Sequence, residues 1–249
     1  MGRKIVSRSN RRPWYEQFKN IMTGRYKKPN FIYLGKEIEE GSIIISNHEG
    51  TDGPMSLELY LDTPLRMWGA HEMNSGLKKL YKYQSEIYYH QKKHWNIHLA
   101  RLFCLIASPL TNLFYKGLNL ISTYKDARFV KTLKESHRAI LNKESVVVFP
   151  EDSTKGYLKE LEGFHSGVVM LAEYCYKKGI DVPIYVTYLK LDSRAYVIDE
   201  PVNYSFLAST CKTREEMAGV LLDRCNKLGK IELDENGIPV KANNEQAIA

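Results

Sequence analysis

The stretch "SIIISNHEGTDGP", residues 42–54, joins a short apolar run to a polar turn. Its three consecutive isoleucines predict a strand that is buried on both faces of a sheet. Asp52 followed by Pro54 is typical of the first turn of a helix. The stretch therefore predicts a strand-to-helix connection, and it places His48 at the carboxyl end of the strand.

A second stretch, "SVVVFPEDSTKGY" at residues 145–157, has the same arrangement. An apolar strand again ends at titratable residues, here Glu151 and Lys155. In open parallel sheets, ligands bind beyond the carboxyl ends of the strands. If the two strands are parallel neighbours, we expect this pair to converge with His48 and Asp52 on one crevice.

Short apolar runs alternate with helical patterns along most of the chain. Strands are predicted at 31–34, 42–46, 65–70, 118–122, 145–149, 183–189 and 195–198. Helices are predicted near 54–62, 74–92, 96–108, 126–142, 165–178 and 213–228. The alternation predicts an α/β fold with a mostly parallel central sheet and helices on both faces. The short link between the first two strands also allows them to form a hairpin.

The basic charge of the chain is concentrated at its N-terminus. Residues 1–30 hold nine Lys or Arg and one acid, although the whole chain carries only +7. Residues 13–22 place aromatic and apolar side chains at helical spacing among these charges. This helix either packs on the domain or lies on an anionic membrane surface, for which residues 1–28 are the expected contact. Nucleic acid is not an expected partner, because no recognition motif accompanies the charge.

Three regions are predicted from these patterns: a basic amphipathic arm at 1–29, a domain at 30–232 and a polar tail at 233–249. The longest apolar stretch, 102–115, is shorter than the roughly 20 residues of a membrane-spanning helix. Pro109 also interrupts it. We therefore expect a cytoplasmic protein, peripherally associated with the inner face of a membrane, whose four cysteines are reduced.

A histidine close to an aspartate suits general-base chemistry. Imidazole titrates near neutral pH, and a carboxylate on its second nitrogen orients the ring. The alternative is that Asp52 only caps the following helix, and the two roles are compatible. His90, His94 and His98 recur every fourth residue and would share one face of a helix, but no cysteine or carboxylate completes a metal site there.

Several blocks of the sequence resemble those of the glycerolipid acyltransferase superfamily, which includes the 1-acylglycerol-3-phosphate acyltransferases. "IIISNHEGTDGP" resembles the family's strand followed by NHxxxxD and proline. "LISTYKDAR" and "FPEDSTKG" resemble the second block and the third, which reads FPEGTRS in the family. "FHSGVVMLA" (164–172) resembles the next helix, and "VPIYVTY" (182–188) resembles the strand of the fourth block. The blocks stand in family order.

This resemblance implies a glycerol-3-phosphate acyltransferase-like fold and acyl transfer to a hydroxyl of a lysophospholipid. The donor is a thioester, either acyl-coenzyme A or acyl carrier protein, and the latter is then a protein partner. His48 is implied as the general base and Asp52 as its orienting group, without a covalent acyl-enzyme. The Gly50–Gly53 turn supplies N–H groups to the oxyanion. The implied substrate-binding residues are Glu151, Thr154, Lys155 and Lys125. No cofactor or metal is implied.

The chain also departs from the family pattern. Three residues separate His48 from Asp52, where the family has four, so Glu49 is an alternative orienting group. Lysines replace the family's arginines at 125 and 155, and lysine lacks the planar fork that grips phosphate. A catalytically weak lipid-binding or interaction protein on the same fold is therefore the competing hypothesis.

Overall fold

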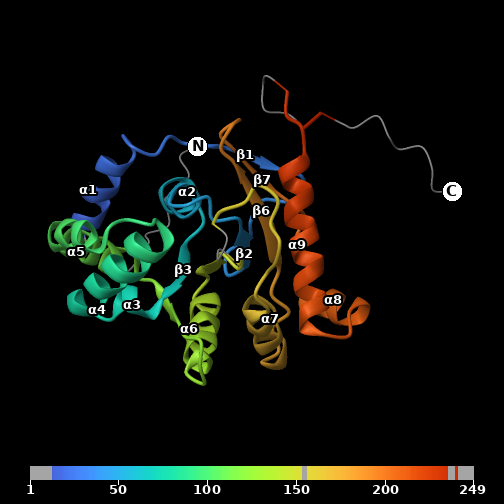
Figure 1. The fold of residues 1–249 in the computed structure, drawn as a ribbon. Helices are drawn as coiled ribbons and strands as arrows, with labels where there is room; N and C mark the ends of the chain where they lie inside the picture. The colour runs from blue at the N-terminus through green and yellow to red at the C-terminus, as the bar shows by residue number, and fades with distance from the viewer. Residues whose placement is uncertain (1–12, 153–155, 235–238, 241–249) are drawn as a thin grey trace.

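Within the described residues, seven strands form one sheet through the centre of the molecule (Figure 1). This computed structural model describes residues 13–152, 156–234 and 239–240. The order is β1-β7-β6-β2-β5-β3-β4, and all neighbours are parallel except β6 and β7. The strands are β1 (Asn30–Tyr33), β2 (Ile43–Ser46), β3 (Leu65–Ala70), β4 (Ile121–Thr123), β5 (Ser145–Val148), β6 (Ile184–Lys190) and β7 (Ala195–Ile198).

Helices cover both faces of this sheet, as the sequence predicts. One face carries α6, α7 and α9, and the other carries α1, α2 and the C-terminal end of α5. The helices are α1 (Pro13–Met22), α2 (Asp52–Tyr60), α3 (His71–Asn74), α4 (Leu77–Lys82), the π-helical η1 (Tyr83–Lys92), α5 (Ile97–Leu118), α6 (Phe129–Leu141), α7 (Gly167–Lys177), α8 (Tyr204–Thr210) and α9 (Arg214–Lys230).

The central strand β2 shows why two layers of helices are needed. Side chains alternate between the faces of a strand, so an unbroken apolar run must be covered on both sides. Ile43 and Ile45 belong to the core beneath α6, α7 and α9. Ile44 belongs to the opposite core, together with Tyr15 of α1 and Leu57 of α2.

The possible hairpin between the first two strands is wrong. β1 lies at the edge of the sheet and pairs with β7, whereas β2 lies between β6 and β5. The physical reason is burial: every residue of β2 is buried, while β1 is partly exposed and can tolerate an edge.

The helices after β3 also differ from the prediction. Gly76, with φ +88°, separates α3 from α4, so the helix predicted at 74–92 begins at Leu77 and continues from α4 directly into the π-helical η1. The helix predicted at 96–108 continues through Pro109 to Leu118. Pro109 is exposed, and its missing N–H removes a bond on the solvent side of the helix. The strand predicted at 118–122 accordingly begins later, at Ile121.

The helix of the N-terminal arm packs on the domain. Tyr15 of α1 is fully buried, and its hydroxyl donates a hydrogen bond to Glu58 Oε1 at 3.3 Å. Its ring lies 6.0 Å from that of Phe114 on α5. A Cβ at Gly117 would lie 1.9 Å from the Tyr15 ring, so glycine at this position lets α1 reach α5.

Candidate active site

Two strand ends converge in the centre of the sheet. β2 and β5 are parallel neighbours, with Ile45 opposite Val148, so the turns after them meet at one edge. Glu151 accepts a hydrogen bond from the backbone N–H of His48 at 2.9 Å through Oε1. The convergence expected for these two residues is therefore present, and the Glu151 carboxylate connects the two turns.

Asn47 fastens the end of β2 to β6. Its Oδ1 accepts a hydrogen bond from the N–H of Leu189 at 2.7 Å, and its Nδ2 donates to the carbonyl oxygen of Leu189 at 3.1 Å. The backbone ladder between these strands ends at Ser46, so the Asn47 side chain extends it by one position. This role of Asn47 was not predicted from the sequence, although an asparagine between a buried strand and a histidine is a signal for it.

The turn after His48 is tight. Glu49 and Gly50 have φ values of +43° and +66°, in the region that favours glycine. At Gly53 a Cβ would meet the carbonyl oxygen of His48 at 2.5 Å, so only glycine allows α2 to begin this close to the strand. The N–H of Gly53 donates to that oxygen at 3.3 Å. Gly53 is therefore engaged in the turn itself, whereas no acceptor for the Gly50 N–H is present among the described residues.

Aromatic rings surround the His48 side chain. The Tyr157 ring stacks on it, with centroids 5.1 Å apart, and the Phe149 ring lies 4.9 Å away at a tilt. Asp52 is the first residue of α2. Within the described residues, no hydrogen bond joins the His48 ring to Asp52 or to Glu49. Glu49 instead accepts a bond from the side chain of Asn47 at 3.5 Å.

A cavity of about 420 Å³ opens beside His48. It is mostly apolar, and its lining comes from segments that are far apart in the sequence. A cavity with such a lining is best suited to bind a hydrocarbon chain. The apolar lining residues are Pro54, Met55, Met67, Trp68, Ala70, Met73, Phe114, Leu118, Leu120, Phe129, Val148, Phe149, Pro150 and Val168.

A second cavity, of about 480 Å³, borders the same turn. Glu49 and Tyr157 line it together with Lys159, Lys190 and Lys230. His48 lines the first cavity, and Tyr157, stacked on His48, lines the second. The histidine therefore stands between an apolar space and a polar one.

Comparison with known proteins supports the fold. No protein-family model matches the sequence, and no curated protein matches it. Among solved structures, the chain is similar to PlsC from Thermotoga maritima, a 1-acyl-sn-glycerophosphate (LPA) acyltransferase, with a TM-score of 0.50 and 14% identity. The match covers 87% of this chain and 79% of PlsC. The chain has an acyltransferase fold. The resemblance inferred from the sequence blocks is confirmed at this level.

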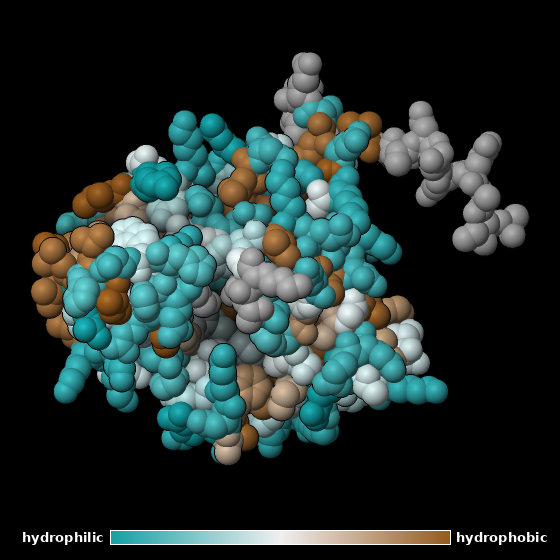
Figure 2. Space-filling model, in the orientation of Figure 1, coloured by the Kyte–Doolittle hydropathy of each residue, from teal (hydrophilic) through white to brown (hydrophobic). Residues whose placement is uncertain are grey.

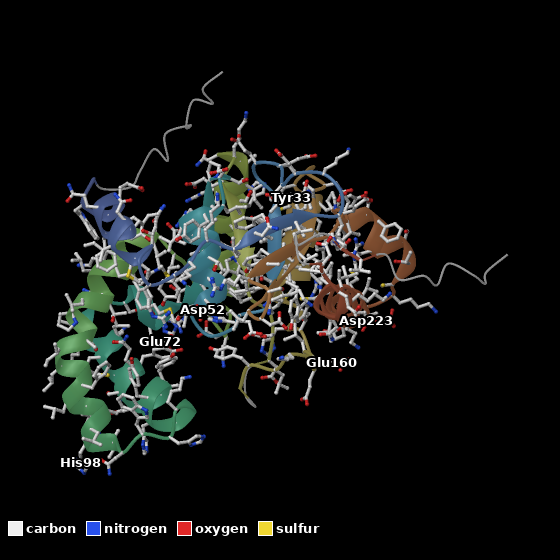
Figure 3. All side chains as sticks on the ribbon, turned by 90° about the horizontal axis from the view of Figure 1, so that it is seen from above. Tyr33, Asp52, Glu72, His98, Glu160 and Asp223 are labelled. Atoms are coloured by element: carbon white, nitrogen blue, oxygen red, sulfur yellow. The ribbon has the colours of Figure 1, made fainter. Side chains whose placement is uncertain are left out.

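Of the remaining predicted residues, the structure describes Lys125 and Asp52. Lys125 follows β4, is exposed and does not line the apolar cavity. Thr154 and Lys155 lie outside the described residues. Figure 3 shows Asp52 on the side of the molecule that also carries Glu72, away from Glu160. Among the described residues, no group of three or more His, Cys, Asp or Glu side chains is arranged to hold a metal ion.

The environment of Glu151 makes folding stability depend on pH. Burial raises its pKa from an ordinary 4.5 to about 7, with Glu49 adding to the rise and the His48 N–H opposing it. Between these two values the folded state holds a proton that the unfolded chain releases. The stabilisation is therefore complete below pH 4.5 and is lost as pH rises through about 7.

Glu151→Gln is expected to remove this contribution to the pH dependence. The amide stays neutral and keeps an oxygen that accepts the His48 N–H. Urea unfolding midpoints of the wild type should fall between pH 5 and pH 8, and those of the variant should fall less. Glu160→Gln, at an exposed carboxylate paired with Lys230, serves as the control and should retain the wild-type slope. Equal slopes in all three proteins would contradict the raised pKa.

Proposed function

We propose that the protein is an O-acyltransferase that moves a fatty acyl group from an acyl thioester to a hydroxyl of a lysophospholipid such as 1-acylglycerol-3-phosphate. The observation that carries the proposal is the position of His48. It stands at the end of a central strand, at the edge of an apolar cavity and next to a polar one. The acyl chain occupies the apolar cavity, and the polar parts of donor or acceptor occupy the second. The acyltransferase fold supports this reading.

In the proposed reaction, His48 takes the proton of the acceptor hydroxyl as the oxygen attacks the thioester carbonyl. The tetrahedral intermediate collapses, the C–S bond breaks, and the proton passes from the imidazolium to the leaving thiolate. The product is an ester and a free thiol, without an acyl-enzyme. The Gly50 N–H is the proposed donor to the oxyanion, because the Gly53 N–H is engaged with His48.

Asp52 stays the proposed orienting group, with Glu49 as the alternative. Catalytic hydrogen bonds are often long in a free enzyme and close only when substrate binds. Thr154, Lys155 and Lys125 are proposed to hold the acceptor phosphate. Glu151 is proposed to help bind the acceptor while its Oε1 holds the turn of His48.

The proposed setting is the cytoplasmic face of a membrane. Acyl-coenzyme A and acyl carrier protein are both suitable donors, since each presents a thioester. The basic arm at 1–28 is the proposed contact with anionic lipid, and its residues 1–12 lie outside the described part of the chain. No cofactor takes part in the proposed chemistry.

Thiol release from each donor, measured with a panel of lysophospholipids and glycerol phosphate, tests the proposal. Release is expected to depend on the acceptor, and mass spectrometry should detect the acylated lipid. The absence of transfer with every donor and acceptor would favour the competing function, a lipid-binding protein. One observation favours this competing function: the His48 ring packs between two aromatic rings and, within the described part of the chain, has no hydrogen bond to Asp52.

Ala70→Phe is expected to shorten the acyl chains that the protein accepts. Ala70 ends β3 and lines the apolar cavity, so a phenyl ring there fills space that a long chain needs. Rates with long-chain donors should fall about tenfold or more relative to short-chain donors. Ala208→Phe, on the exposed side of α8, is the matched control and should leave chain preference unchanged. The same chain preference in both variants would place the acyl chain elsewhere.

A further inference from the structure

A helical insertion separates strands β3 and β4. We use this name for residues 77–118, which comprise α4, η1 and α5. Its sequence contains seven Lys or Arg and one acid, Glu86. The insertion extends away from the sheet, and His98 marks the end of α5 farthest from it (Figure 3). The charge of this segment suits an anionic partner.

One side of α5 packs against the rest of the insertion. Ala100, Cys104 and Ser108 recur every fourth residue and are buried. The Ser108 hydroxyl donates to Gln84 Oε1 of η1 at 2.7 Å. These small side chains let α5 lie close to η1, so this side of the helix belongs to the protein interior.

The other side of α5 is apolar and exposed. Leu102, Ile106 and Leu110 are 62%, 74% and 63% exposed, at the spacing of one helical face. Figure 2 shows apolar side chains gathered at the edge of the molecule that carries α5 and α1. Scattered apolar residues are ordinary on a surface, but a continuous face of them indicates an interaction site. The exposed apolar residues of the face are Leu99, Leu102, Phe103, Leu105, Ile106, Leu110 and Leu113.

Aromatic side chains gather where η1 meets α5. The Trp95 ring lies 4.8 Å from that of Tyr89 and 5.6 Å from that of Phe103. Trp95 is 41% exposed, and the exposed side chain of Lys93 lies close by in the sequence. Tryptophan and tyrosine next to basic residues are typical of the boundary between lipid tails and headgroups.

By length and composition, α5 is the one helix of the described residues that passes as a membrane span. Its packing favours a different placement. The buried row on α5 holds it against η1, and its end at Gly117 and Leu118 is buried in the domain beside Tyr15. A spanning orientation would break these contacts, whereas a helix lying in the membrane plane keeps them.

We propose that the helical insertion is the surface that docks the protein on an anionic lipid bilayer, with the exposed face of α5 immersed among the acyl chains. The same helix reaches the apolar cavity, because Phe114, Tyr115 and Leu118 line it. A lipid tail can pass along α5 toward His48 without crossing water. The docking rests on the exposed face and charge alone, while this delivery rests on the proposed function.

Flotation with vesicles of phosphatidylcholine and phosphatidylglycerol tests the docking. The variant Leu102→Gln/Ile106→Gln/Leu110→Gln is expected to bind about tenfold more weakly or worse, because it removes apolar surface from the immersed face. All three side chains are largely exposed, so the variant should fold. The matched control is Val130→Gln/Leu141→Gln/Phe206→Gln, which changes exposed apolar residues on α6 and α8 and should bind as the wild type does.

Tryptophan fluorescence gives a second measurement. Lipids brominated on their tails should quench the wild type, and most of this quenching should disappear in Trp95→Phe. Equal flotation of the wild type and the α5 variant, or no quenching from Trp95, would overturn the docking. A wild-type dimer that the α5 variant converts to monomer, with flotation unchanged, would assign the face to a second copy instead.

Transfer assays separate the two proposals. The α5 variant should lose activity toward acceptors embedded in vesicles and keep it toward a short-chain lysophospholipid in solution. If the wild type transfers no acyl group but the α5 variant still loses flotation, the docking is supported and the proposed function is contradicted. Equal transfer to embedded acceptors by the variant and the wild type would contradict delivery along α5.

Discussion

Replacing His48 with alanine is expected to lower the rate of acyl transfer by about 10²- to 10⁴-fold, the usual contribution of a general base. Among the described residues between β2 and α2, His48 is the titratable side chain that lines the apolar cavity; His165, just before α7, lines it from another segment. The hydroxyl of the acceptor is not nucleophilic enough until its proton is taken. The effect should appear mainly in kcat, because the imidazole acts on the proton that moves in the reaction, and the other residues that line the two cavities are unchanged.

The control for this variant is His137→Gln. His137 lies on α6, packs against the Tyr174 ring at 5.7 Å and does not line the apolar cavity. Its replacement should leave the rate close to that of the wild type. Circular dichroism and thermal unfolding check that both variants are folded. Undiminished transfer by a folded His48→Ala protein would end the general-base assignment.

Asn47→Ala is expected to lower the free energy of unfolding by about 2–4 kcal/mol. The variant leaves the N–H and the carbonyl oxygen of Leu189 without the side chain that pairs both. The site is buried, so water cannot easily replace these bonds. Transfer should also fall, because the position of His48 depends on the residue before it. Urea unfolding and thiol release measure the two effects.

Asn142→Ala is the matched control for this prediction. Asn142 follows α6 and is exposed, so its replacement should change stability by no more than about 0.5 kcal/mol. A similar loss in both variants would show that the pairing with Leu189 contributes little. A stable Asn47→Ala protein that lost activity would instead confine the role of Asn47 to the site.

The sequence by itself determined the strands of the sheet and the edge where the site lies, but it did not predict α8 or the π-helical form of η1. Ile43, Ile44 and Ile45 are apolar without interruption, and such a run belongs in the centre of a covered sheet. The residues that follow a parallel strand lie at its carboxyl end wherever the strand is placed. His48 and Glu151 were therefore predictable as neighbours once their strands were taken to be adjacent.

The tertiary structure decided everything that depends on which distant segments meet. The pairing of β1 with β7, the bonds from Asn47 to Leu189 and the contact of Glu151 with the His48 N–H join residues that are more than 100 positions apart. The periodicity of side chains within one element does not predict such long-range contacts. The apolar cavity likewise exists only because side chains from several elements leave a space between them.

The same difference between local sequence and tertiary contacts applies to α5. Its sequence shows an apolar helix interrupted by proline, and composition does not distinguish a core helix from a membrane-facing one. Only the packing shows that the small residues face η1 and that the leucines and isoleucine face outward. Local sequence determines which surfaces a helix has, and its neighbours determine which of these surfaces stays exposed.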